Sequence, residues 1–147
     1  MPSSNQGGMN RLPAPHGLLI DRSQPVSFTF EGKTIEGLAG DSIASALLAN
    51  GQTMISRSFK YHRPRSVLTM NGQDANTLVQ VGDEPSCLAD KRAITPGLKV
   101  EAQNYFGSFE DDKGRFVEAL QRFLPVGFYY KSMHEKKNSW KAWEPIV

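Results

Sequence analysis

Hydrophobic and polar residues alternate along residues 26–30, which read VSFTF. A period of two residues places the apolar side chains on one face of an extended segment, so this stretch predicts a half-buried strand. Residues 31–33 form a short Glu-Gly-Lys turn signal, and residues 34–37 are expected to return as the second strand of a hairpin. The ordered part of the chain, which we place from Leu18 onward, therefore begins with two antiparallel strands.

The hydrophobic period changes after the hairpin. Apolar residues now recur at spacings of three and four, as on one face of a helix, at Ile43, Ala46 and Leu47. Asp41 is the predicted N-cap, because its carboxylate can accept hydrogen bonds from the free amides of the first helical turn. The pair Asn50-Gly51 predicts the C-terminal end. The result is a short, alanine-rich helix that packs closely on one face.

Further strands are expected at residues 77–81 and 98–102, with weaker candidates at residues 87–90 and 91–94. A hairpin, one helix and further strands predict an α+β roll in which the helix lies on one face of the sheet. The predicted core consists of Val26, Phe28, Phe30, Ile43, Leu47, Leu78 and Val81.

The two ends of the chain differ from this central domain at residues 18–104. Residues 1–17 contain several Gly and Pro residues and few apolar ones, which predicts a flexible arm; Arg11-Leu12 is the alternative, a small anchor within it. Residues 105–147 form a C-terminal extension. Its residues 114–124 have the pattern of an amphipathic helix, which Pro125 would end.

The C-terminal extension is rich in aromatic residues, with six from Phe123 to Trp143. This segment is too short to form its own core, so the aromatic surface must be buried against the roll or against another chain. Phe128, Tyr129 and Tyr130 lie where the chain leaves the domain and are therefore candidate interface residues.

Composition excludes several kinds of site. Cys87 is the only cysteine, which excludes any site that needs two or more thiolates, and the three histidines are too far apart for a zinc motif. A formal charge of +2 does not indicate nucleic-acid binding. The sequence has neither an apolar run long enough to span a bilayer nor the apolar region of a secretory signal, so we expect a cytoplasmic protein without membrane contact.

Positive charge is concentrated in one loop. No carboxylate occurs between Ser42 and Gln73, whereas this window contains Arg57, Lys60, Arg63 and Arg65. One interpretation is a solvated basic loop. The other is a docking surface for an anion, either a dinucleotide phosphate on an adjoining domain or an acidic protein partner, for which the planar guanidinium is well suited.

Three segments carry a family resemblance: residues 40–51, GDSIASALLANG; residues 57–65, RSFKYHRPR; and residues 125–131, PVGFYYK. They resemble the N-terminal domain of the alpha subunit of heterotetrameric sarcosine oxidase, and the resemblance extends over about residues 11–147. It implies a β-grasp roll of the 2Fe–2S ferredoxin type, followed by a helical, aromatic-rich extension that leads toward a dinucleotide-binding domain or a partner.

Related amine and opine dehydrogenase subunits and hydrogen cyanide synthase hold a 2Fe–2S cluster in this fold, with C-x4-C-x2-C after an arginine-containing loop. The resemblance places the four cysteine positions on Thr69, Asp74, Thr77 and Ile94. None of the four is a cysteine, so we expect no iron–sulfur cluster. This absence is typical of the sarcosine oxidase branch of the fold.

The resemblance implies a structural or assembly role in a flavin-dependent enzyme that oxidatively demethylates sarcosine, with FAD, FMN and NAD in the complete enzyme. This chain contains neither a G-x-G loop for a dinucleotide nor an acid–base cluster, so we expect no cofactor and no catalytic residue in it. Its partners would be other domains of the alpha subunit or other subunits; the chain is either an excised domain or a natural small subunit. The alternative function is a stand-alone protein-binding module on a ubiquitin-like roll.

Overall fold

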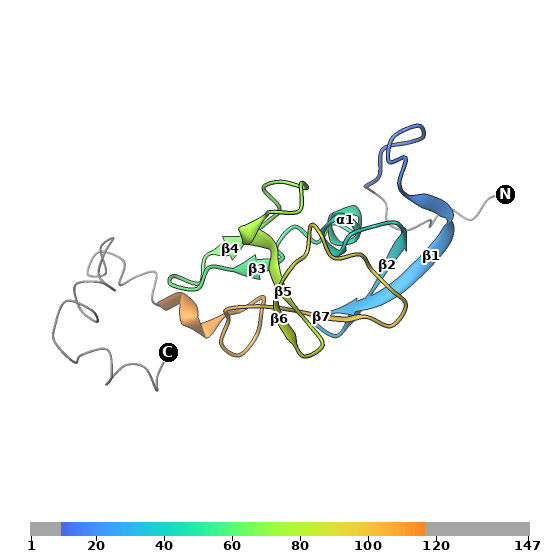
Figure 1. Cartoon of the computed structure of the whole chain (residues 1–147). Helices are drawn as coiled ribbons and strands as arrows, with labels where there is room; N and C mark the ends of the chain where they lie inside the picture. Colours follow the sequence, from blue (N-terminus) through green and yellow to red (C-terminus); the bar gives the residue numbers. More distant parts are fainter. Residues whose placement is uncertain (1–9, 117–147) are drawn as a thin grey trace.

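A computed structural model of the chain describes residues 10–116 and shows a mixed sheet with one α-helix (Figure 1). In chain order the elements are β1 (Asp21–Phe30), β2 (Lys33–Ala39), α1 (Ile43–Ala49), β3 (Ser56–Arg57), β4 (Pro64–Arg65), the 3-10 turn η1 (Ala75–Thr77), β5 (Leu78–Val81), β6 (Glu84–Leu88), β7 (Lys99–Ala102) and the 3-10 turn η2 (Lys113–Arg115). Within the described residues no helix is both long and apolar enough to cross a membrane.

The main sheet has five strands in the order β2-β1-β7-β5-β6. Strands β1 and β7 are parallel, with Phe30 opposite Val100, and the other neighbours are antiparallel. Strands β1 and β2 form a hairpin, and β7 lies beside β1 on its other side. This is the β-grasp arrangement. This confirms the predicted α+β roll. A separate two-stranded sheet, β3-β4, projects from one end of the molecule (Figure 1).

Helix α1 packs its apolar residues against the five-stranded sheet. Ile43, Ala46 and Leu47 lie in one buried cluster with strand residues such as Phe28 and Val100. Five of the seven predicted core residues are buried, and Val26 and Leu78 are half-buried at the margin. The candidate strand at residues 91–94 is absent: these residues form a turn and a single bridge to Ser42.

The N-cap prediction was one residue off. Ser42 caps α1: its hydroxyl accepts from the Ser45 amide at 3.2 Å, and the Ser45 hydroxyl accepts from the Ser42 amide at 2.9 Å. This reciprocal pair is a capping box. The carboxylate of Asp41 is buried next to the cap and accepts from the amide of Leu38 and the hydroxyl of Ser45, both at 2.8 Å.

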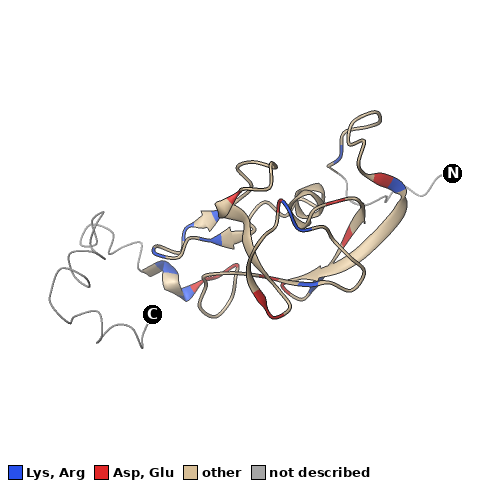
Figure 2. Cartoon of the chain, viewed as in Figure 1, with Lys and Arg blue, Asp and Glu red and all other residues tan. Residues whose placement is uncertain are grey.

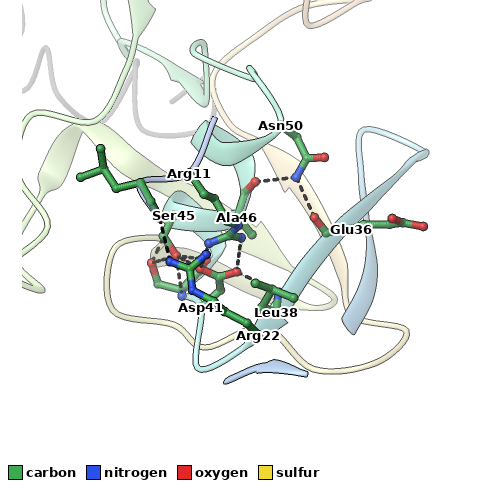
Figure 3. A network of polar contacts seen from close by, with 10 residues as sticks. Arg11, Arg22, Glu36, Leu38, Asp41, Ser45, Ala46 and Asn50 are labelled. Carbon is green, nitrogen blue, oxygen red and sulfur yellow. Dashed lines mark hydrogen bonds and ion pairs between the residues drawn. The ribbon is translucent and has the colours of Figure 1, made fainter. Parts of the chain in front are cut away.

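Asp41 also holds the N-terminal arm. Both terminal nitrogens of Arg11 donate to its carboxylate (Figure 3). The Asn10 amide donates to the carbonyl of Ala49. The Arg22 guanidinium donates to the carbonyls of Leu12 and His16. For residues 10–17 this corrects the expectation of a flexible arm, because Arg11 anchors the segment to the start of α1. The remainder of the arm lies outside the described residues.

Candidate functional site

The basic loop, residues 57–65, coincides with the β3-β4 hairpin, which pairs Ser56 with Arg65 and Arg57 with Pro64. Within the turn the Ser58 amide donates to the carbonyl of Arg63, and the His62 amide donates to the carbonyl of Ser58, both at 2.9 Å. His62 has a φ of +54°, a left-handed conformation that costs energy for a residue other than glycine. The loop therefore has a defined shape that other contacts must hold.

Arg57 provides one of these contacts from inside the domain. The residue is 3% exposed, and its guanidinium donates to the carbonyls of Phe109 at 2.8 and 3.0 Å, His62 at 2.9 Å and Glu110 at 3.1 Å. The guanidinium therefore links the basic loop to the segment that follows β7. The prediction of Arg57 as an interface residue is corrected, because its donors are used within this chain.

Asp112 provides the second contact. Its side chain is buried, and one oxygen lies 2.8 Å from Nδ1 of His62 and 3.7 Å from Nε of Arg57. The other oxygen accepts from the amides of Phe106 and Gly114, each at 2.8 Å. We call Arg57, His62 and Asp112 the buried brace. It joins the basic loop to residues 106–114, which follow β7.

The electrostatics of the brace favour a charged carboxylate. Burial alone would raise the pKa of Asp112, but the amides of Phe106 and Gly114 and the His62 ring hold this pKa below its ordinary value. Gly114 is required sterically, because a Cβ at this position would lie 2.4 Å from Nδ1 of His62. Sequence reasoning missed Asp112, since fifty residues separate it from His62 and no local pattern connects them.

The remaining cations of the basic loop point outward. Arg63 and Arg65 are exposed and Lys60 is half-buried. Lys60 Nζ and Arg63 Cζ lie 5.0 and 4.8 Å from the centre of the Tyr61 ring, which fixes their approximate direction. One terminal nitrogen of Arg65 donates to Oδ1 of Asn76 at 2.9 Å.

Basic residues gather at this end of the molecule (Figure 2). Turn η2 adds Lys113 and Arg115, both exposed, directly after the buried brace. Exposed aromatic side chains occur in the same segments: Phe59 is 71% exposed, Phe106 62% and Phe116 66%. Aromatic residues and arginine are enriched in protein interfaces. The candidate interface residues Phe128, Tyr129 and Tyr130 lie outside the described residues.

Three of the four cluster positions lie in one loop between β4 and β5. Asp74 is 2% exposed and caps η1. Its Oδ2 accepts from the amides of Leu68 at 2.6 Å and Thr69 at 3.1 Å, and its Oδ1 accepts from the amide and side chain of Asn76 at 2.9 and 3.0 Å. Thr77 is fully buried, and its hydroxyl donates to the Asp74 carbonyl at 3.0 Å.

The fourth position, Ile94, is a core residue. Its Cδ1 would lie 2.4 Å from a Cβ added to Gly37, and its amide donates to the carbonyl of Asp41 at 3.0 Å. Two hydroxyls, a carboxylate and a hydrocarbon cannot replace the four thiolates of a 2Fe–2S cluster. Among the described residues no group of three or more His, Cys, Asp or Glu side chains is arranged to hold a metal. The donor set at these positions therefore does not fit the cluster.

Cys87 does not compensate for the missing thiolates. It is buried on β6, and burial, together with the side chain and charge of Glu84, raises the pKa of its thiol. A thiol with a raised pKa is a poor nucleophile and a poor ligand at neutral pH. We therefore assign Cys87 a packing role.

Two curated relatives are alpha subunits of sarcosine oxidase. The alpha subunit of sarcosine oxidase from Rhizobium meliloti is 42% identical over 144 residues, which is 95% of this chain and 15% of that subunit. The alpha subunit from Corynebacterium sp. strain P-1 is 38% identical over 79 residues, 52% of this chain and 8% of that subunit. The resemblance to sarcosine oxidase alpha subunits is thus confirmed, and the chain spans about one sixth or less of these relatives.

A solved L-proline dehydrogenase from P. horikoshii is 27% identical, with a TM-score of 0.49 over 60% of this chain and 17% of that one. The model of a protein family, described as the 2Fe-2S iron-sulfur cluster binding domain, matches residues 23–105. This region contains most of β1, all of strands β2 to β7 and helix α1. The chain therefore belongs to the 2Fe-2S iron-sulfur cluster binding domain family.

Proposed function

We propose that this chain is an assembly domain of a flavin-dependent amine oxidoreductase of the sarcosine oxidase type and is not catalytic by itself. The observation that carries the proposal is the 42% identity to a sarcosine oxidase alpha subunit over 95% of the chain. The same match covers only 15% of that subunit. Oxidation of the amine, and the FAD, FMN and NAD expected in the complete enzyme, belong to other domains or subunits under this proposal.

The proposal includes the loss of the iron–sulfur cluster. It is supported by the donor chemistry at Thr69, Asp74, Thr77 and Ile94 and by the single cysteine of the sequence. A cluster held by thiolates requires four of them, and one cannot suffice.

We expect the protein to carry no iron–sulfur cluster even when it is produced with ample iron and cysteine. The visible spectrum should lack the charge-transfer bands of a 2Fe–2S centre, and iron and acid-labile sulfide analyses should give far less than one equivalent per chain. Stoichiometric iron with matching sulfide would refute this part of the proposal.

The basic loop is the proposed contact with the rest of the enzyme. The buried brace fixes the backbone of the loop from inside the domain. Docking through Arg63 and Arg65 therefore costs less backbone conformational entropy than docking through a flexible loop would cost. Their planar guanidinium groups match carboxylates and phosphates. We propose an acidic patch on an adjoining domain or subunit as the partner, with Lys60 at the margin of the contact.

The double variant Arg63→Ala, Arg65→Ala is expected to weaken association with the partner subunits while leaving the stability of the isolated chain nearly unchanged. Both side chains are exposed, and substitutions at such sites usually change stability by less than about 0.5 kcal/mol. Association is measured by titration or co-purification, and stability by thermal unfolding. The variant Lys91→Ala, Lys99→Ala removes the same charge from exposed positions elsewhere and is the matched control. A loss of several degrees in Tm with normal association would make the two arginines structural.

A further inference from the structure

The loop at residues 66–77 is organised around one buried side chain. Four hydrogen-bond donors converge on the carboxylate of Asp74: the amides of Leu68, Thr69 and Asn76 and the side-chain amide of Asn76. Asp74 is buried, with 2% of its surface exposed. Hydrogen bonds to an ionised acceptor are among the strongest in proteins, and here they join both ends of the loop.

The same residue is fixed through its main chain. The Asp74 amide donates to Oδ2 of Asp90 at 3.2 Å, and the Asp74 carbonyl accepts from the amide of Thr77 at 3.1 Å and from its hydroxyl at 3.0 Å. Asp90 is itself buried. Asp74 therefore cannot leave its position without breaking contacts with η1 and with the turn that follows β6.

This arrangement explains how a family fold that normally encloses a cluster can keep its loop without one. A cluster held by thiolates accepts hydrogen bonds through its sulfurs. We propose that the Asp74 carboxylate takes the place of the iron–sulfur cluster as the internal acceptor around which residues 66–77 fold, so that the loop is ordered without any metal. Thr77, at the position of another lost ligand, binds the main-chain carbonyl of Asp74 through its amide and its hydroxyl.

Hydrogen bonds continue from this carboxylate to the basic loop. Oδ1 of Asp74 accepts from the side-chain amide of Asn76, and Oδ1 of Asn76 accepts from Arg65. Asp74 therefore helps to orient one of the arginines of the docking surface, a consequence that rests on the proposed function. The order of the loop does not rest on it, and the experiment below measures the loop alone.

The test is amide hydrogen exchange on the isolated 147-residue chain, treated with EDTA, read by NMR at single amides. In the wild type the amides of Leu68, Thr69 and Asn76 should be protected without metal. Asp74→Asn should lower this protection by at least about tenfold, because the charged acceptor is lost, while amides of β5 keep theirs. Asp83→Asn, in the exposed turn after β5, is the matched control and should change nothing.

A second measurement needs no substitution and covers the case in which Asp74→Asn does not fold. In the wild type the amide chemical shifts of Leu68 and Thr69 should titrate together with the Asp74 carboxyl carbon, in one step at acidic pH. The inference is overturned if these amides do not follow the Asp74 carboxyl. It is also overturned if they exchange freely in the EDTA-treated wild type, or if Asp74→Asn folds and keeps their protection.

Discussion

Replacing Asp112 by alanine is expected to lower the free energy of unfolding by about 3–5 kcal/mol, the range measured when one member of a buried ion pair is removed. The substitution leaves Arg57 and His62 buried beside an empty acceptor site and leaves the amides of Phe106 and Gly114 without their partner. Urea denaturation of the isolated chain, followed by circular dichroism, measures the loss.

Two variants sharpen this experiment. Asp111→Ala removes an exposed carboxylate from the adjacent position and should cost less than about 0.5 kcal/mol. Asp112→Asn keeps one oxygen for the Phe106 and Gly114 amides but removes the charge next to His62, and its effect should lie between the other two. If Asp112→Ala costs no more than Asp111→Ala, the brace does not hold the domain together.

The pH dependence of the wild type should show the same carboxylates. The pKa values of Asp74 and Asp112 are lowered in the folded chain, so each group stabilises the fold fully above its unfolded pKa of about 3.9. This stabilisation is lost as the pH falls through the lower, folded pKa. The unfolding free energy should therefore decline below about pH 4, and Asp112→Asn should decline less steeply because one of the two linked groups is absent.

Replacing Leu47 by alanine is expected to cost about 2–5 kcal/mol, because the side chain is fully buried and its removal leaves a cavity between α1 and the sheet. The helix itself would tolerate alanine, so the loss measures packing and not helix propensity. Urea denaturation measures the change.

An exposed leucine provides the control for this packing effect. Leu68 is 80% exposed, and Leu68→Ala should change the unfolding free energy by less than about 0.5 kcal/mol. An effect below half a kilocalorie for Leu47→Ala would place α1 away from the sheet and contradict the fold described above.

The parts of this fold that local patterns determine were predictable from the sequence. The period-two segment at residues 26–30 is the end of β1, and the Asn50-Gly51 stop coincides with the end of α1. The N-cap was misplaced because Asp41 and Ser42 are both good capping residues. The contacts with Arg11, thirty residues earlier, and with the Leu38 amide show that the Asp41 carboxylate has another role.

The candidate site was predictable only in its exposed part. Arg63 and Arg65 point outward as the concentration of positive charge suggested, but Arg57 has the same charge and lies inside the domain. Arg57 differs because it contacts the carbonyls of Phe109 and Glu110 and the carboxylate of Asp112, which are all distant in sequence. The four cluster positions revealed a lost ligand set that includes Asp74. That its carboxylate accepts from the amides of Leu68 and Thr69 depends on how the loop folds, which no local sequence pattern indicates.

We propose that this chain is a non-catalytic part of a sarcosine oxidase-type assembly. The direct test is to purify the chain under native conditions from cells that produce it and to measure bound flavin and sarcosine-dependent oxygen consumption across the size-exclusion profile. The separately produced chain serves as the comparison. We predict that flavin and activity co-elute with the native chain as one large species, and that the isolated chain has neither. A native chain that elutes alone without flavin or activity, or an isolated chain that oxidises sarcosine, would contradict the claim.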